Sequence, residues 1–284
     1  MKQFLKRVCA AVLVCCALFS ASAQAKYSNP FISPLGSCYS ITGTTVIVTI
    51  FVSDPVNSWD FNQKADMDTY SKIYYRLKTA AEWLTKQIKR YGANPTFVWD
   101  WYNQDYLYYT YTSDRYLARQ DYTYQEIRTF IQNNIDLERI KRYYRADNVV
   151  FLACYDDPPK TYEGCTAWNW DYEASGANKE YALEIIWISD EDRHAKKVSA
   201  ASFAHEIMHC FGAVDLYTAS ENIPQRYVNH LKSSKSKDIM FAIDYNTPES
   251  IGEKFTELDA YYLGLTRNSA DQKKYGLGIG SHWK

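Results

Sequence analysis

Three strongly apolar runs constrain the fold of this chain more than any other feature, and two segments of helical periodicity lie between the first and the second. The runs are Thr44–Val52, Asn148–Cys154 and Ala182–Ser189, and each is rich in Val or Ile. Continuous rather than alternating apolar character predicts buried strands, as in a parallel sheet whose faces are covered by helices. We therefore expect these three runs to form the centre of the fold.

Two further segments have the spacing of amphipathic helices. They are Asp66–Tyr91 and Tyr124–Tyr144, and Thr96–Trp101 and Cys165–Asp171 are candidate additional strands. The apolar stripe of the first helix is made by Tyr70, Ile73, Leu77, Ala80, Ala81, Leu84 and Ile88. Strands that alternate with helices predict an α/β fold with a twisted, mostly parallel, five-stranded sheet. The chain after Ser189 holds one more helix and then a less regular part. We expect the less regular part to form a smaller C-terminal subdomain.

Residues 1–25 have the pattern of a secretory signal peptide. Basic residues precede an apolar run from Val8 to Phe19, and the segment ends in Ala23-Gln24-Ala25, an A-x-A cleavage site. The apolar run is shorter than the roughly 18 to 20 residues that a membrane span needs. We therefore expect cleavage after Ala25, a secreted or periplasmic protein, and no membrane span once the signal is removed.

Composition excludes several classes of function. The 284 residues carry a net charge of −1, with 46% hydrophobic and 23% charged side chains. These values are ordinary for a globular protein and argue against a disordered or polytopic membrane protein. Because the chain has no basic surplus, we expect no nucleic-acid partner.

The cysteines outside residues 1–25 are Cys38, Cys154, Cys165 and Cys210. An even number in an exported protein favours disulfides, with three possible pairings. Cys154 and Cys165 flank a turn-rich segment, so we expect these two to pair and to leave Cys38 with Cys210.

The helix expected after Ser199 carries the residues of a metal site. Ser199 is a suitable N-cap, and no helix breaker precedes Gly212, so His205 and His209 lie four residues apart on one face. Two imidazoles in this arrangement can bind one Zn²⁺, with Glu206 beside them as a general base toward a metal-bound water.

Gly212 and Asp215 extend this pattern. Gly212 lets the backbone leave the helix sharply, so the carboxylate of Asp215 can turn back toward the metal as a third ligand. Three protein ligands leave a fourth position open, which is typical of a catalytic zinc site.

The segment HEIMHCFGAVD resembles the HExxHxxGxxH/D motif of the metzincin clan of zinc endopeptidases, in the Asp variant of snapalysin-like bacterial proteases. Ser236–Phe241 looks like the Met-turn of that clan, and Leu258–Gly264 resembles its C-terminal helix. The resemblance covers residues 199–264. It implies that His205, His209 and Asp215 are ligands of one catalytic Zn²⁺, that Glu206 is the base and that Met240 has a structural role.

This resemblance also implies an activity and a domain organisation. We expect a secreted, monomeric zinc endopeptidase that acts on a protein or peptide substrate. Its parts would be a signal peptide (1–25), an N-terminal segment (26–43), a catalytic subdomain with the active-site helix (44–212) and a C-terminal subdomain with the Met-turn (213–284).

The sequence leaves two points of the site open: which carboxylate is the third ligand, and whether a tyrosine assists the reaction. A gluzincin-type peptidase would instead take Glu257 as its third ligand, although Gly212 and Met240 would then have no role. Some metzincins have a Tyr two residues after the Met, where this chain has Ala242, and Tyr217 or Tyr245 could take that place.

Cys38 and the Tyr-rich segment Tyr102–Tyr124 each allow two interpretations. Cys38 could be a thiol that blocks the zinc rather than half of a disulfide. The Tyr-rich segment could form a recognition surface or a packed insertion. With a recognition surface and a vestigial zinc site, the chain would be an extracellular protein- or glycan-binding protein instead of an enzyme.

Overall fold

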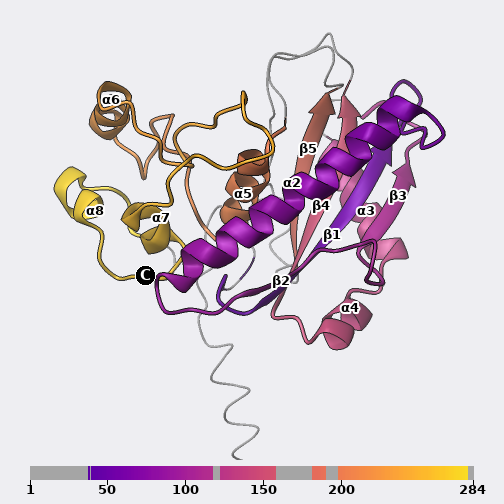
Figure 1. Cartoon of the computed structure of the whole chain (residues 1–284), viewed down its shortest axis with the longest axis horizontal. Coiled ribbons are helices and arrows are strands. Elements are labelled where there is room, and N and C mark those ends of the chain that lie inside the picture. Colours follow the sequence, from indigo (N-terminus) through magenta and orange to yellow (C-terminus); the bar gives the residue numbers. More distant parts are fainter. Residues whose placement is uncertain (1–37, 39, 118–121, 158–180, 190–197, 281–284) are drawn as a thin grey trace, which may run out of the picture.

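A computed structural model describes residues 38, 40–117, 122–157, 181–189 and 198–280. The expected signal peptide, Cys165 and the candidate edge strand Cys165–Asp171 lie outside the described residues. The described part is an α/β structure around one five-stranded, parallel sheet (Figure 1). The α/β class and the mostly parallel sheet predicted from the sequence are therefore confirmed.

The sheet is centred on the apolar runs of the sequence. Its strands are β1 (Thr44–Ser53), β2 (Thr96–Val98), β3 (Tyr108–Thr112), β4 (Asn148–Asp157) and β5 (Ala182–Ser189). The order is β2-β1-β4-β5, and β3 pairs with the second half of β1. Strand β3 comes from the Tyr-rich segment and was not predicted, because its half-exposed tyrosines have no clean period of two.

Seven helices lie within the described residues. They are α2 (Lys64–Lys89), α3 (Thr123–Asn134), α4 (Leu137–Tyr144), α5 (Ala200–His209), α6 (Gln225–Ser233), α7 (Glu257–Tyr262) and α8 (Ala270–Tyr275). No described helix is both long enough and apolar enough to cross a membrane.

The single helix expected over Tyr124–Tyr144 is wrong, because the chain breaks it into α3 and α4. Ile135 is extended, with φ −118° and ψ 119°, and ends α3. The Asp136 carboxylate then accepts the N–H of Arg139 at 2.9 Å and caps α4. A local side-chain cap thus interrupts a periodicity that continues through it.

The long helix α2 and the helix α5 pack against each other on one face of the sheet, and α3 lies on the opposite face (Figure 1). Arg76, which is only 3% exposed, ties α2 to the start of α5. Its Nη1 donates to the Val198 carbonyl at 2.8 Å, and its Nη2 donates to Glu249 at 2.6 Å. These contacts fix the beginning of α5 relative to α2.

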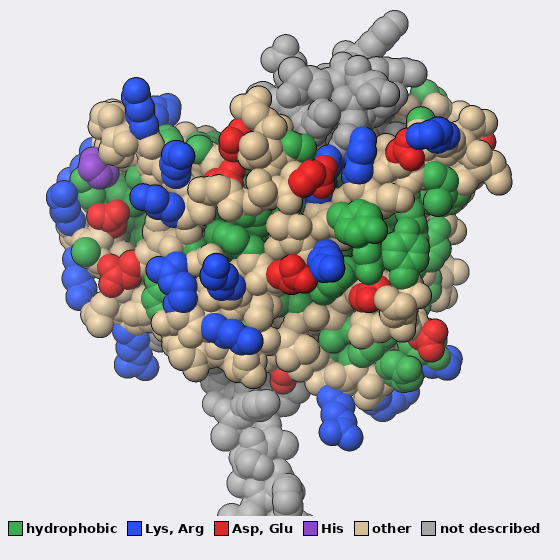
Figure 2. Space-filling view, in the orientation of Figure 1, with side chains coloured by type: hydrophobic (Ala, Val, Ile, Leu, Met, Phe, Trp, Pro, Cys, Tyr) green, Lys and Arg blue, Asp and Glu red, His purple; other side chains and the backbone are tan. Residues whose placement is uncertain are grey.

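The chain after α5 lies beside the sheet and carries α6, α7 and α8 (Figure 1). Its buried side chains, such as Met240 and Leu258, belong to the same hydrophobic cluster as those of the strands. Figure 2 shows Lys and Arg side chains concentrated on this part of the visible face and hydrophobic side chains gathered toward the opposite end.

Candidate metal centre

Helix α5 begins with a reciprocal cap. The Ser199 hydroxyl accepts the N–H of Ser202 at 3.1 Å, and the Ser202 hydroxyl accepts the N–H of Ser199 at 3.1 Å. All ten residues of α5 are buried, so the helix runs through the interior rather than over the surface. The predicted N-cap is therefore confirmed, and it sets the phase that places His205 and His209 on one face.

Three ligand atoms converge at the end of α5. Nε2 of His205 and Nε2 of His209 are 3.0 Å apart, and Asp215 Oδ1 is 3.2 Å from the first and 3.1 Å from the second. The histidines are 4% and 8% exposed. Helical spacing in the sequence predicted the two histidines as neighbours, and the structure also brings the expected Asp215 to them.

The other nitrogen of each ring is held by the backbone. His205 Nδ1 lies 3.0 Å from the Ile239 carbonyl, and His209 Nδ1 lies 2.9 Å from the Ala213 carbonyl. A carbonyl oxygen can only accept, so each Nδ1 carries a proton and, in the neutral ring, each Nε2 presents a lone pair. Both lone pairs point toward the Asp215 carboxylate.

This donor set fits a metal cation. Two nitrogen lone pairs and a carboxylate oxygen repel one another unless a positive charge lies between them. Tetrahedral bonds of about 2.0 Å place ligand atoms about 3.3 Å apart, close to the three separations observed. The buried group of His205, Glu206 and His209 could hold a metal ion, and the Asp215 carboxylate oxygen lies within 3.2 Å of both imidazoles of that group.

The loop that carries Asp215 is shaped by Gly212. This glycine has a φ of 101°, a left-handed value that L side chains rarely adopt, and it reverses the chain after α5. The N–H of Leu216 donates to the Met240 carbonyl at 2.9 Å, which holds the loop against the turn that contains Met240. Met240 is 1% exposed and belongs to the hydrophobic core cluster.

Electrostatics at the site are dominated by Asp215. Burial alone would lower the pKa of His209, but the adjacent Asp215 carboxylate outweighs it and raises that pKa to about 10. Burial opposes ionisation of Asp215, yet the two imidazoles outweigh it and hold its pKa well below the usual range. Without a bound cation, a proton therefore occupies the position between His209 and Asp215.

Glu206 lies beside the ligands. It is 7% exposed, and its Oε1 is 4.0 Å from His205 Nε2. Burial raises its pKa, while His205 and His209 act in the opposite direction. A buried carboxyl group with a raised pKa is suited to accept a proton and release it again.

Tyr217, one of the two candidate tyrosines, lies at the site. Its hydroxyl donates to Asp215 Oδ2 at 2.8 Å, and the residue is 49% exposed. Burial of the hydroxyl and the Asp215 carboxylate together raise its pKa. Asp215 thus uses Oδ1 toward the histidines and Oδ2 toward Tyr217.

Glu257, the alternative third ligand, lies elsewhere. It is exposed at the start of α7, and its Oε2 accepts the N–H of Ala270 at 3.3 Å. It therefore contributes to the junction of α7 and α8, and Asp215 is the carboxylate that contacts both histidines.

The predicted disulfide between Cys38 and Cys210 is not formed in the structure, and Cys154 is also a buried thiol. The Cys38 N–H donates to the Cys210 carbonyl at 3.0 Å, so the two residues are neighbours. Each sulfur has its own acceptor instead: Cys38 Sγ lies 3.8 Å from the Val149 carbonyl, and Cys210 Sγ lies 3.4 Å from Glu184 Oε1. Cys165, the expected partner of Cys154, lies outside the described residues.

The alternative role of Cys38 as a thiol that blocks the zinc has no support in this geometry. Its sulfur faces β4, and it is not one of the side chains that form the possible metal-binding group of the described residues.

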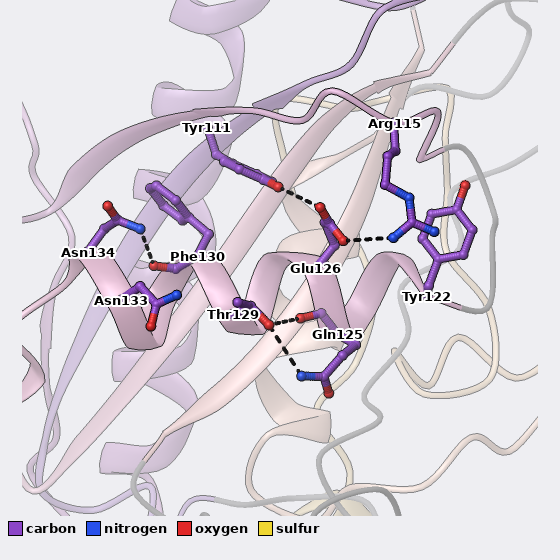
Figure 3. Close-up of a pocket in the computed structure, with 9 residues that line it drawn as sticks. All are labelled: Tyr111, Arg115, Tyr122, Gln125, Glu126, Thr129, Phe130, Asn133 and Asn134. Atoms are coloured by element: carbon purple, nitrogen blue, oxygen red, sulfur yellow. Dashed lines mark hydrogen bonds and ion pairs between the residues drawn. The ribbon is translucent and has the colours of Figure 1, made fainter.

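A pocket of about 320 Å³ lies between β3 and α3, and none of its lining residues belongs to the candidate metal centre (Figure 3). Its lining side chains are largely bonded to one another. Glu126 accepts from Tyr111 at 3.2 Å and from Arg115 at 3.5 Å, and the Arg115 guanidinium stacks 3.9 Å from the Tyr122 ring centroid. The Tyr-rich segment therefore contributes strand β3 and part of the lining of this pocket, where its side chains contact one another.

Comparisons with known proteins add no family. No protein-family model matches the chain, and no curated protein matches it in sequence. Thirteen chains of solved structures match. One, from a structure described as a chaperone-substrate complex, aligns with 64% of this chain and 26% of its own length, at 15% identity and a TM-score of 0.30. That likeness is too low to carry an argument.

Proposed function

We propose that this protein is a zinc-dependent endopeptidase in which His205, His209 and Asp215 hold the metal and Glu206 is the general base. The observation that carries the proposal is the convergence of two imidazole Nε2 atoms and one carboxylate oxygen within 3.2 Å, next to a buried glutamate. Two nitrogen ligands and one oxygen ligand favour zinc over magnesium or calcium, which prefer oxygen alone.

The metal, when bound, would lower the pKa of a coordinated water to about 7 and polarise a carbonyl group. Glu206 would accept a proton from the attacking water at its carboxylate and pass it to the leaving amine, and its raised pKa suits both transfers. Tyr217, whose hydroxyl is anchored on Asp215, is exposed enough to meet a substrate. The Nδ1 hydrogen bonds to Ile239 and Ala213 keep both rings in the tautomer that ligation needs.

The proposal includes export and substrate class. The sequence of residues 1–25 supports a secreted or periplasmic protein, and the resemblance at residues 199–264 supports a protein or peptide substrate. A zinc-binding, non-catalytic recognition protein is the alternative that the following experiment separates.

The test is cleavage-site profiling of a denatured proteome with the zinc-loaded chain and with Glu206→Gln. We expect discrete cleavages by the wild type, abolished by a chelator and restored by zinc. The Glu206→Gln variant should retain zinc but lose about 10²- to 10⁴-fold in rate, the usual contribution of a general base. Stoichiometric zinc with no cleavage by the wild type would contradict the proposal and favour the recognition protein.

A further inference from the structure

A tight turn over residues 238–242, called here the 238–242 turn, contacts the metal centre. The N–H groups of Phe241 and Ala242 both donate to the Asp238 carbonyl at 3.0 Å. The N–H of Ile239 donates to the Lys254 carbonyl at 3.0 Å. The turn is thus closed on itself and anchored to a second segment of the chain.

Two carbonyl groups of this turn hold the two parts of the ligand set. The Ile239 carbonyl accepts from His205 Nδ1 at 3.0 Å, and the Met240 carbonyl accepts the N–H of Leu216 at 2.9 Å, one residue after Asp215. The hydrogen bond at Nδ1 fixes the tautomer and direction of a ligating imidazole. A shift of this turn would therefore move the helical ligand and the loop ligand together.

The side chain of Asp238 holds the turn in place. It is only 2% exposed. Its Oδ1 accepts the N–H of Met240 at 2.8 Å, and its Oδ2 accepts the hydroxyl of Thr256, the N-cap of α7, at 2.8 Å. A buried carboxyl group is unfavourable unless its oxygens are bonded, and here both oxygens are used, one by the turn and one by α7.

We propose that Asp238 is a positioning residue for the metal centre, which fixes the 238–242 turn and through it the orientation of His205 and of the loop that carries Asp215. The inference rests on the metal centre of the proposed function and adds a residue with no ligand atom at the metal. The sequence indicated Ser236–Phe241 only as a turn around Met240, so the role of Asp238 emerges first from the structure.

The test measures metal binding without any substrate. Dissociation constants for Zn²⁺, from competition with a chromophoric chelator, and the visible absorption spectrum of the Co²⁺-loaded protein are compared for wild type, Asp238→Ala and Asp238→Asn. Asp244→Ala is the matched control, because the exposed Asp244 carboxylate also accepts a backbone N–H two residues on, at 2.9 Å from Asn246.

We expect Asp238→Ala to weaken zinc binding by about 10- to 100-fold, as loss of an outer partner of a ligand does, and to change the Co²⁺ spectrum. Asp238→Asn should remain within a few-fold of wild type, because its amide oxygen can still accept from Met240 and its NH₂ can donate to Thr256. Asp244→Ala should match wild type. Folded Asp238→Ala with wild-type zinc affinity and an unchanged Co²⁺ spectrum would overturn the proposal.

A second variant covers the case in which Asp238→Ala does not fold. Asp238→Ser keeps one acceptor for the Met240 N–H and should lie between the alanine and asparagine variants in zinc affinity; equality with wild type would refute the role of Asp238. A chain that binds zinc but cleaves nothing would contradict only the proposed function. Weaker zinc binding by Asp238→Ala would still support the positioning role in that case.

Discussion

The ligands of the candidate metal centre come from two regions that are built in different ways. Helix α5 supplies His205 and His209 through its own backbone ladder, so their spacing follows from helical geometry alone. The loop after Gly212 supplies Asp215, and its position depends on single hydrogen bonds such as that from Leu216 to Met240. The helical half is therefore set by local geometry, and the loop half is set by distant contacts.

The largest effect should come from the helical half. His209→Ala removes one of the two nitrogen ligands, so we expect zinc affinity to fall by more than about 100-fold, beyond the loss seen for outer partners. Equilibrium dialysis with metal analysis measures this. His230→Ala on α6, where the imidazole stacks on Tyr275 at 5.0 Å, is the control and should bind zinc as the wild type does. Unchanged zinc binding by His209→Ala would contradict the assignment of His209 as a zinc ligand.

A smaller effect is expected from the loop half. Asp215→Asn keeps an oxygen near both imidazoles but removes the negative charge, so zinc affinity should fall about 10- to 100-fold. Glu257→Gln is the matched control, because its carboxylate bonds Ala270 instead. The zinc affinity of both variants, measured by competition titration, decides whether Asp215 or Glu257 is the third ligand. Normal binding by Asp215→Asn together with loss in Glu257→Gln would reverse the choice of third ligand.

Per pH unit, the smallest and most gradual effect is that of pH. The pKa of His209 is raised to about 10 in the metal-free protein, so at pH 7 this ring holds a proton that zinc must displace. Zinc affinity should therefore rise with pH, by up to about tenfold per unit, and this gain should level off near pH 10. Calorimetry in buffers of different ionisation enthalpy measures the released proton. Binding at pH 7 with no proton release would contradict the coupling of His209 to Asp215.

The same contrast explains what the sequence could predict. The strands β1, β4 and β5 and the phase of α5 follow from apolar periodicity and a serine cap, which are local signals. Strand β3 could not be predicted, because its sequence periodicity is weak and the strand is stabilised by pairing with β1. The break between α3 and α4 could not be predicted either, because the helical periodicity continues through it and is overridden by the Asp136 cap. The position of Asp215 could be anticipated from Gly212. The contribution of Asp238 depends on Thr256 and on the backbone carbonyl that holds His205, which no local pattern reveals.

The cysteines are a second example of a feature that depends on distant contacts and that the sequence does not reveal. An even count predicted disulfides, and the expected pairing of Cys154 with Cys165 left Cys38 with Cys210; the structure does place these two residues side by side. The acceptors that occupy their sulfurs, a strand carbonyl and the buried Glu184, lie on β4 and β5. Such acceptors become visible only once the sheet is assembled.

X-ray absorption at the zinc edge of the zinc-loaded protein tests the central claim most directly, because it reports the type and distance of the ligand atoms. We predict two imidazole nitrogens together with oxygen ligands at about 2.0 to 2.2 Å and no sulfur. Loss of one imidazole in His209→Ala would identify its source. A sulfur ligand at about 2.3 Å, or a single imidazole in the wild type, would contradict the site formed by His205, His209 and Asp215.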